Sequence, residues 1–120
     1  MSVLASIFVV IVAVEHLYIM YLETIATASE KTAQTFNMKL QVLKDKNIQV
    51  LLKNQGIYNG LLAIALFYGL FFSTNPQEMV SLLLIFIILA AVYGSLTSSK
   101  SIILKQGGPA IIALILVLFL

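Results

Sequence analysis

Two glutamates and the single histidine of the chain lie in one short stretch of very apolar sequence. Residues 15–23 read EHLYIMYLE and directly follow the run VLASIFVVIVAV at 3–14. Carboxylates and an imidazole can exchange protons, hold a cation or orient a polar ligand. A charged side chain at the centre of a bilayer costs about 2.5–3.5 kcal/mol on insertion scales, so such residues face protein or water and mark candidate functional sites.

Further polar side chains lie in the other apolar segments, in KNQGIYNG at 53–60, YGSLT at 93–97 and KQGGPA at 105–110. The candidate ligand-binding residues are Glu15, His16, Tyr18, Glu23, Asn54, Gln55, Tyr58, Asn59, Tyr93, Thr97 and Gln106. At 100° per residue, His16 and Glu23 share a helix face two turns apart, and Glu15 flanks them. The four candidates at 54–59 fall within an arc of about 140°, opposite Gly56 and Gly60.

The composition is that of a membrane protein. Of the 120 residues, 61% are hydrophobic and 10% are charged, and the mean hydropathy is +1.05, outside the range of soluble globular domains. The absence of cysteines excludes disulfides and thiolate chemistry. The net charge of only +2 gives nucleic-acid binding little support. The first apolar segment has no basic n-region or cleavage site, which predicts a retained span.

A transmembrane helix needs about 20 residues to cross roughly 30 Å of hydrocarbon. We therefore predict an all-α membrane protein, one domain over residues 1–120, whose four transmembrane helices form a bundle. The predicted spans are about 3–24, 50–73, 77–98 and 101–120, and the short turn at 73–78 makes the second and third a hairpin. The fourth span has a break at Gly107–Pro109 that either frees backbone carbonyls for a polar site or is an ordinary proline kink.

The first connection, at 27–49, is a polar linker with apolar residues among its lysines. We predict a partly helical, amphipathic segment along the cytoplasmic membrane surface, or else an extension of the second span. Lysines flank the first connection (Lys31, Lys39, Lys44, Lys46, Lys53) and the third (Lys100, Lys105), and none flanks the second. The positive-inside rule then makes the first and third connections cytoplasmic and places both termini outside, in a multi-pass protein of the cell (plasma) membrane.

Depth suggests that the polar residues meet. At 1.5 Å per residue, Glu15 lies about 12 Å inward of Glu23, and counting from Leu51 places Tyr58 and Asn59 near the depth of Glu15. We expect all four helices to bring polar side chains to the cytoplasmic half of the membrane. The outer half is nearly pure Leu, Ile, Val and Phe. Three pairs of small residues, Gly56/Gly60, Ala65/Gly69 and Ala90/Gly94, predict close helix packing.

These stretches resemble a family of small integral membrane proteins known as domain of unknown function 1304. The resemblance lies in EHLYIMYLE at 15–23, NQGIYNGLLA at 54–63, VYGSLT at 92–97 and KQGGPA at 105–110. The family pattern carries over onto all eleven candidate residues and onto Gly56, Gly60, Gly94, Gly107, Pro109 and Ala110. This chain departs from it at Gly108, where a larger apolar residue is usual, and at Ala91-Val92. The resemblance implies four spans and no established activity.

Three functions fit these residues. The first is a cytoplasm-facing intramembrane pocket that binds a small polar or cationic ligand or protons, with Glu15 as the charge or proton carrier. Binding is favoured over transport because the outer half offers no polar lining. The second is a membrane-embedded enzyme acting on a lipid or isoprenoid, in which His16 and Glu15 or Glu23 exchange protons. The third is a structural bundle whose polar network only fixes helix packing.

Partners and cofactors follow from the same considerations. Residues for acid–base catalysis are present and a nucleophile motif is absent, so enzymatic activity stays open but is not favoured. No cofactor is predicted. His16 and Glu23 are weak candidates for a metal site, because their spacing matches no recognised metal-binding signature. The expected partners are the lipid bilayer, a small-molecule or lipid ligand and, since 120 residues make a thin bundle, a second copy of the chain.

Overall fold

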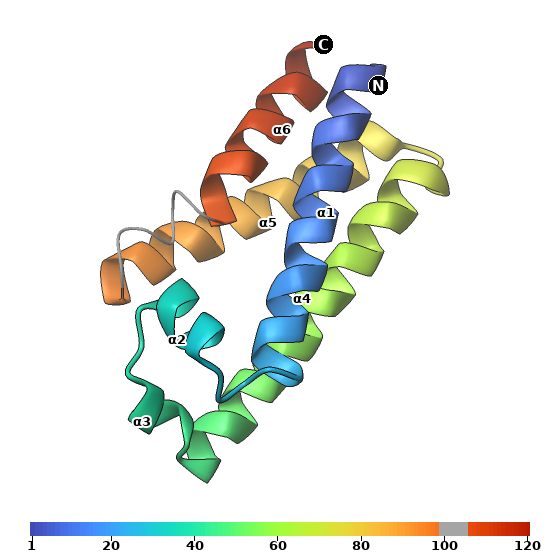
Figure 1. Ribbon diagram of the computed structural model, residues 1–120. Helices are drawn as coiled ribbons and strands as arrows, with labels where there is room; N and C mark the ends of the chain where they lie inside the picture. Colours follow the sequence, from blue (N-terminus) through green and yellow to red (C-terminus); the bar gives the residue numbers. More distant parts are fainter. Residues whose placement is uncertain (99–105) are drawn as a thin grey trace. The chain divides into compact units, whose positions relative to one another are not determined.

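The computed structural model describes residues 1–98 and 106–120, and in this part of the chain it contains helices and no strands (Figure 1). This confirms the predicted all-α class. The helices are α1 (Val3–Thr24), α2 (Glu30–Phe36), α3 (Leu40–Leu43), α4 (Lys46–Phe71), α5 (Pro76–Thr97) and α6 (Gly108–Phe119).

Three of these helices, α1, α4 and α5, have the length and apolar composition needed to cross a membrane. They correspond to the first three predicted spans. The fourth prediction, 101–120, is met only in part: α6 has 12 residues, which at 1.5 Å each is about 18 Å and too short to cross. Residues 101–105 of that prediction lie outside the described residues. The described chain therefore has three candidate spans where four were predicted.

The break predicted at Gly107–Pro109 coincides with the start of α6. Gly107 is the N-cap residue, and Pro109 lies in the first turn of the helix. Proline is tolerated there because its missing N–H is one that the helix would leave unpaired anyway. Gln106 and Gly107 form a π-helical turn that leads into α6, so the two interpretations of the break, a polar site or a proline kink, stay predictions.

The chain forms two compact units. Residues Met1–Glu15 and Leu62–Leu120 form the first, here called the terminal unit, and residues His16–Leu61 form the second, here called the linker unit. Each has its own buried side chains.

In the terminal unit, α5 packs against α6. The buried side chains of α6 are small or β-branched, namely Ala110, Ala113 and Val117, and small residues allow helix backbones to approach closely. The Gln77 side chain of α5 donates a hydrogen bond to the Val117 carbonyl over 3.0 Å. In α4, a Cβ atom on Gly69 would lie 2.8 Å from Met79 Cγ, so the glycine permits this contact.

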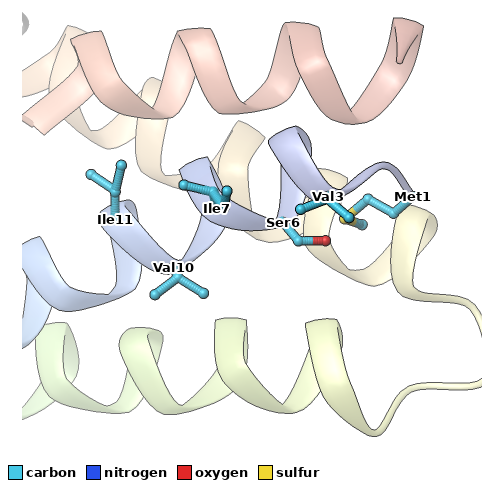
Figure 2. A pocket seen from close by; sticks show the side chains of 6 residues that line it. All are labelled: Met1, Val3, Ser6, Ile7, Val10 and Ile11. Carbon is cyan, nitrogen blue, oxygen red and sulfur yellow. The ribbon is translucent and has the colours of Figure 1, made fainter.

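A recess of about 360 Å³ lies on one face of the N-terminal half of α1 (Figure 2). Its lining is Met1, Val3, Ser6, Ile7, Val10 and Ile11. The one hydroxyl among them, Ser6 Oγ, donates to the Ser2 carbonyl of its own helix over 3.0 Å. The recess therefore offers a ligand mainly apolar surface.

The turn between α4 and α5 is fixed by Asn75. Its side-chain oxygen accepts a hydrogen bond from the Glu78 backbone N–H over 3.2 Å, and its amide donates to Glu78 Oε2 over 3.0 Å. Pro76 follows in the first turn of α5. Asn75 is thus the N-cap of α5, and it gives the predicted hairpin turn a defined geometry.

Asn75→Ala is expected to lower the free energy of unfolding by about 1 kcal/mol, because it removes this cap. Asn54→Ala is the matched control, since Asn54 is exposed and its amide donates to the Val50 carbonyl of its own helix. Thermal unfolding in detergent micelles measures both variants. Equal midpoints for the two would contradict the capping role.

In the linker unit, two short helices occupy the predicted linker. Ser29 caps α2 by accepting from the Thr32 N–H over 3.2 Å, and α2 ends at Asn37 in the left-handed conformation (φ 54°). Asp45 Oδ1 accepts from the backbone N–H groups of Asn47 and Ile48 over 2.8 and 3.3 Å. This cap starts α4 at Lys46, four residues before the predicted start of the second span.

Candidate functional site

The most distinctive polar group of the linker unit is the Glu23 carboxylate, one residue before the end of α1. Glu23 has 0% exposed surface. Asn59 Nδ2 donates to Glu23 Oε1 over 2.7 Å, and Gln55 Nε2 donates a short hydrogen bond to Glu23 Oε2. Each carboxylate oxygen therefore has one amide partner, and both amides come from α4. We call these three residues the Glu23 site.

The geometry of α4 explains why these two amides meet one carboxylate. Gln55 and Asn59 are four residues apart and lie on one face, one turn above the other. Side chains at this spacing lie about 5–6 Å apart, close enough to reach the two oxygens of one carboxylate.

Two glycines let α1 and α4 come close enough for these bonds. A Cβ atom on Gly56 would overlap Thr24 Oγ1 and lie 3.1 Å from Glu23 Cβ. One on Gly60 would overlap Met20 Sδ and lie 3.2 Å from Met20 Cγ. The small-residue pair at 56 and 60 is therefore a packing seam, as predicted, and it runs beside the Glu23 site.

Two threonines cap the end of α1, and neither is among the residues predicted from the sequence. Thr27 Oγ1 donates to the Glu23 carbonyl over 2.7 Å. Thr32 Oγ1, which is fully buried, lies 2.7 Å from the Ala26 carbonyl and 3.1 Å from that of Leu22. They satisfy carbonyls that a helix end leaves without partners. The threonine four residues after Glu23 was the available signal, because a hydroxyl at this spacing can reach the i−4 carbonyl.

Asn54 and Tyr58 lie apart from the Glu23 site, although they belong to the same predicted arc. The Asn54 amide donates to the Val50 carbonyl over 2.8 Å, and Tyr58 is 72% exposed. The cause is angular: they precede Gln55 and Asn59 by one residue each, and successive residues of a helix are rotated by about 100° around its axis. The structure divides the predicted arc between two faces of α4.

On α1, the other predicted residues of the linker unit have different environments. His16 is buried, with 2% exposure. The Tyr18 ring is half exposed and stacks on Tyr21, with ring centroids 6.5 Å apart. A role for His16 in acid–base chemistry stays a prediction.

The remaining predicted residues belong to the terminal unit. Glu15 Oε1 is buried and has no hydrogen-bond partner among the residues that the structure describes. Thr97 Oγ1 donates to the carbonyl of Tyr93 over 3.0 Å, and the Tyr93 ring is 69% exposed. Gln106 is half-buried immediately before α6. Convergence of these residues with those of the linker unit stays a prediction.

Comparison with known proteins gives the family. Residues 10–118 match the family described as "Protein of unknown function (DUF1304)". The chain belongs to this family. This confirms the resemblance found in the polar motifs.

The DUF1304 chain is also similar to "Uncharacterized protein YpaA" of Lactococcus lactis subsp. lactis (strain IL1403). The two are 56% identical over 115 residues, which cover 96% of this chain and 97% of the relative. No solved structure matches the chain. Neither the family nor this relative has a stated activity.

A metal centre was a weak prediction for this DUF1304 protein. Within residues 1–98 and 106–120, no three acidic, histidine or cysteine side chains are grouped so that they could hold a metal ion. Glu23 instead has amides as its side-chain partners.

Proposed function

We propose that this protein is a multi-pass integral membrane protein of the plasma membrane, with α1, α4 and α5 as spans and a fourth span that ends in α6. Three helices with the length and composition of spans support this, as do the apolar side chains exposed along them, such as Ile11, Ile64 and Leu82. The lysine distribution favours cytoplasmic first and third connections and outward termini.

Within this protein, we propose that the Glu23 site binds a proton or a small cation. The observation that carries the proposal is a carboxylate with no exposed surface whose two oxygens each face a side-chain amide. A buried acid in a membrane span usually marks a functional site. Its position at the end of α1 places it at the cytoplasmic end in the proposed topology.

The amides suit this role because each carries a donor and an acceptor. With Glu23 ionised, Gln55 and Asn59 present their N–H groups to it. Rotation of an amide by 180° presents its oxygen instead, which accepts a hydrogen bond from protonated Glu23. The side-chain amide oxygens of Gln55 and Asn59, together with the Glu23 carboxylate, are also the kind of ligand that hard cations prefer. The site can thus offer Glu23 a donor when it is ionised and an acceptor when it is protonated.

Binding is favoured over transport by the rest of α1. From Ile7 to Val14 this helix carries only apolar side chains, so it offers no polar lining along which a proton or cation would continue. Uptake and release at one membrane side is therefore the proposed activity.

Infrared difference spectroscopy tests the proposal on protein reconstituted in lipid nanodiscs. Between acidic and neutral pH, we expect a carboxylic acid C=O band that is lost in Glu23→Gln and shifted in Asn59→Ala. Asn54→Ala is the matched control and leaves the band unchanged. Exchange of sodium for a bulky organic cation tests cation binding in the same way. Spectra of Glu23→Gln identical to wild type under both exchanges would contradict the proposal.

A structural role is the second candidate, and one observation favours it: both Glu23 oxygens are already paired beside the tight glycine seam. Buried hydrogen-bonded networks can fix one helix arrangement without any ligand. Under this alternative, Glu23→Gln retains the fold and no proton or cation exchange is detected at position 23 in wild type. The infrared experiment therefore separates the two candidates.

A further inference from the structure

The surface of the linker unit carries a concentration of positive charge. Residues 25–53 hold five lysines, all of them exposed, and two acidic residues. The lysines are Lys31, Lys39, Lys44, Lys46 and Lys53. We call α2, α3, the residues joining them and the first two turns of α4 the basic linker surface.

One of the two acidic residues caps a helix through hydrogen bonds to its backbone. Asp45, between Lys44 and Lys46, caps α4 by accepting from two backbone N–H groups. A carboxylate at a helix N-terminus is stabilised there by the helix dipole and the free N–H groups. Its flanking lysines remain directed to the outside and are available to a partner.

The segments that carry the lysines are held against α1 and α4 by hydrogen bonds and apolar contacts. Thr32, next to Lys31, bonds to the last carbonyls of α1, and Phe36 packs with Ile19 and Leu22 of α1. At the other end, Gln49 Nε2 of α4 donates to the Leu43 carbonyl over 2.9 Å. The linker is thus tied to the ends of two candidate spans, where lipid headgroups lie in the proposed topology.

Apolar side chains are exposed among these lysines. Ile25, Val42 and Leu51 are each at least 40% exposed. Lysines beside exposed apolar residues are typical of segments that lie in a membrane interface, because the apolar side chains enter the acyl boundary and the amines reach the phosphates. A nucleic acid would satisfy the charges and leave the apolar side chains in water, whereas a lipid surface satisfies both; an acidic protein is the alternative that the experiment below separates.

We propose that the basic linker surface binds the headgroups of anionic phospholipids. Clusters of four or more lysines next to a membrane span attract anionic lipids, and the attraction decays within a Debye length of about 8 Å at physiological ionic strength. This inference rests on the proposed membrane insertion and is independent of what the Glu23 site binds.

Single-cysteine labelling tests the proposal, since the chain has no cysteine. A fluorophore on Val42→Cys in α3 reports from the basic linker surface. The full-length protein is placed in nanodiscs of phosphatidylcholine and phosphatidylglycerol in equal amounts, with bromine quenchers on one lipid or the other. We expect brominated phosphatidylglycerol to be enriched at the label by about fivefold or more, the effect of one lysine near the surface, and the enrichment to fall with added salt.

Two variants complete the experiment. Replacing Lys31, Lys39, Lys44 and Lys46 with glutamine is expected to remove the preference. A label on Thr74→Cys, in the turn between α4 and α5 where no lysine lies, is the control and is expected to be quenched equally by both lipids.

Equal quenching by both lipids at position 42, or a preference that survives the glutamine substitutions, would overturn the lipid assignment. A shift of the position-42 label with an acidic polypeptide in neutral discs, without a lipid preference, would overturn it in favour of a protein partner. A protein that fails to enter nanodiscs, so that neither label is quenched, would instead refute the proposed membrane insertion.

Discussion

Gly56→Leu is expected to separate α1 from α4 at the Glu23 site and to lower the free energy of unfolding by about 3 kcal/mol, the upper end of the usual cost of overpacking. The first atom of the new side chain already overlaps Thr24 Oγ1. It also lies 3.3 Å from the Met20 carbonyl oxygen, which is backbone and cannot rotate away. Relief therefore requires the two helices to move apart, and this removes the Asn59 and Gln55 hydrogen bonds to Glu23.

Asn54→Leu is the matched control for this variant. It introduces the same side chain two residues earlier on α4, at an exposed position, and surface substitutions usually change stability by less than about 0.5 kcal/mol. Unfolding in mixed micelles, followed by the accessibility of a cysteine placed at Leu52, a buried position one turn before Gly56, reports both stability and helix separation. A Gly56→Leu protein as stable as Asn54→Leu would show that the glycine seam is not a tight contact.

The sequence predicted where apolar helices lie better than where helices begin. Hydropathy located α1, α4 and α5 because a span must be apolar over its length. It placed the start of the second span near residue 50, whereas the Asp45 cap starts α4 at Lys46. The start of an apolar stretch marks where the chain is expected to enter the hydrocarbon of the membrane. The helix itself can begin several residues earlier, where a capping side chain satisfies its first N–H groups.

This difference bears on the candidate site. Counting from Leu51 placed Asn59 at the depth of Glu15, but its amide bonds to Glu23. A depth count assumes that helices run along the membrane normal from a common edge, and packing at Gly56 and Gly60 decides the actual alignment. The residue types were predictable from the cost of burying them, whereas their pairing depended on contacts between helices.

The contacts that the linker makes with α1 could not be predicted from the sequence either. Nothing in the segment 27–49 signals that Thr32 returns to the Leu22 carbonyl or that Phe36 packs beside Ile19. Such contacts depend on the path of the chain between two helices, and local propensity does not determine that path.

Glu23→Ala is expected to lower the free energy of unfolding by about 1–3 kcal/mol, the usual cost of leaving a buried hydrogen-bond donor unsatisfied. The substitution removes the acceptor of the Gln55 and Asn59 amides, of which Asn59 is half-buried, whereas Gln55 is exposed and can turn to water. Glu30→Ala, at an exposed position in the first turn of α2, is the matched control and is expected to cost well under 1 kcal/mol.

A double-mutant cycle with Asn59→Ala separates the pairwise interaction from the cost of the empty space. If the 2.7 Å hydrogen bond between Asn59 and Glu23 contributes as the geometry indicates, the two single losses exceed the loss in the double variant by about 0.5–3 kcal/mol. A cycle of Glu23→Ala with Asn54→Ala is expected to be additive, because the Asn54 amide donates to the Val50 carbonyl of its own helix and not to Glu23. Additivity in both cycles would show that Glu23 stabilises the linker unit without Asn59, and the amide would then have no part in holding a proton or cation at this carboxylate.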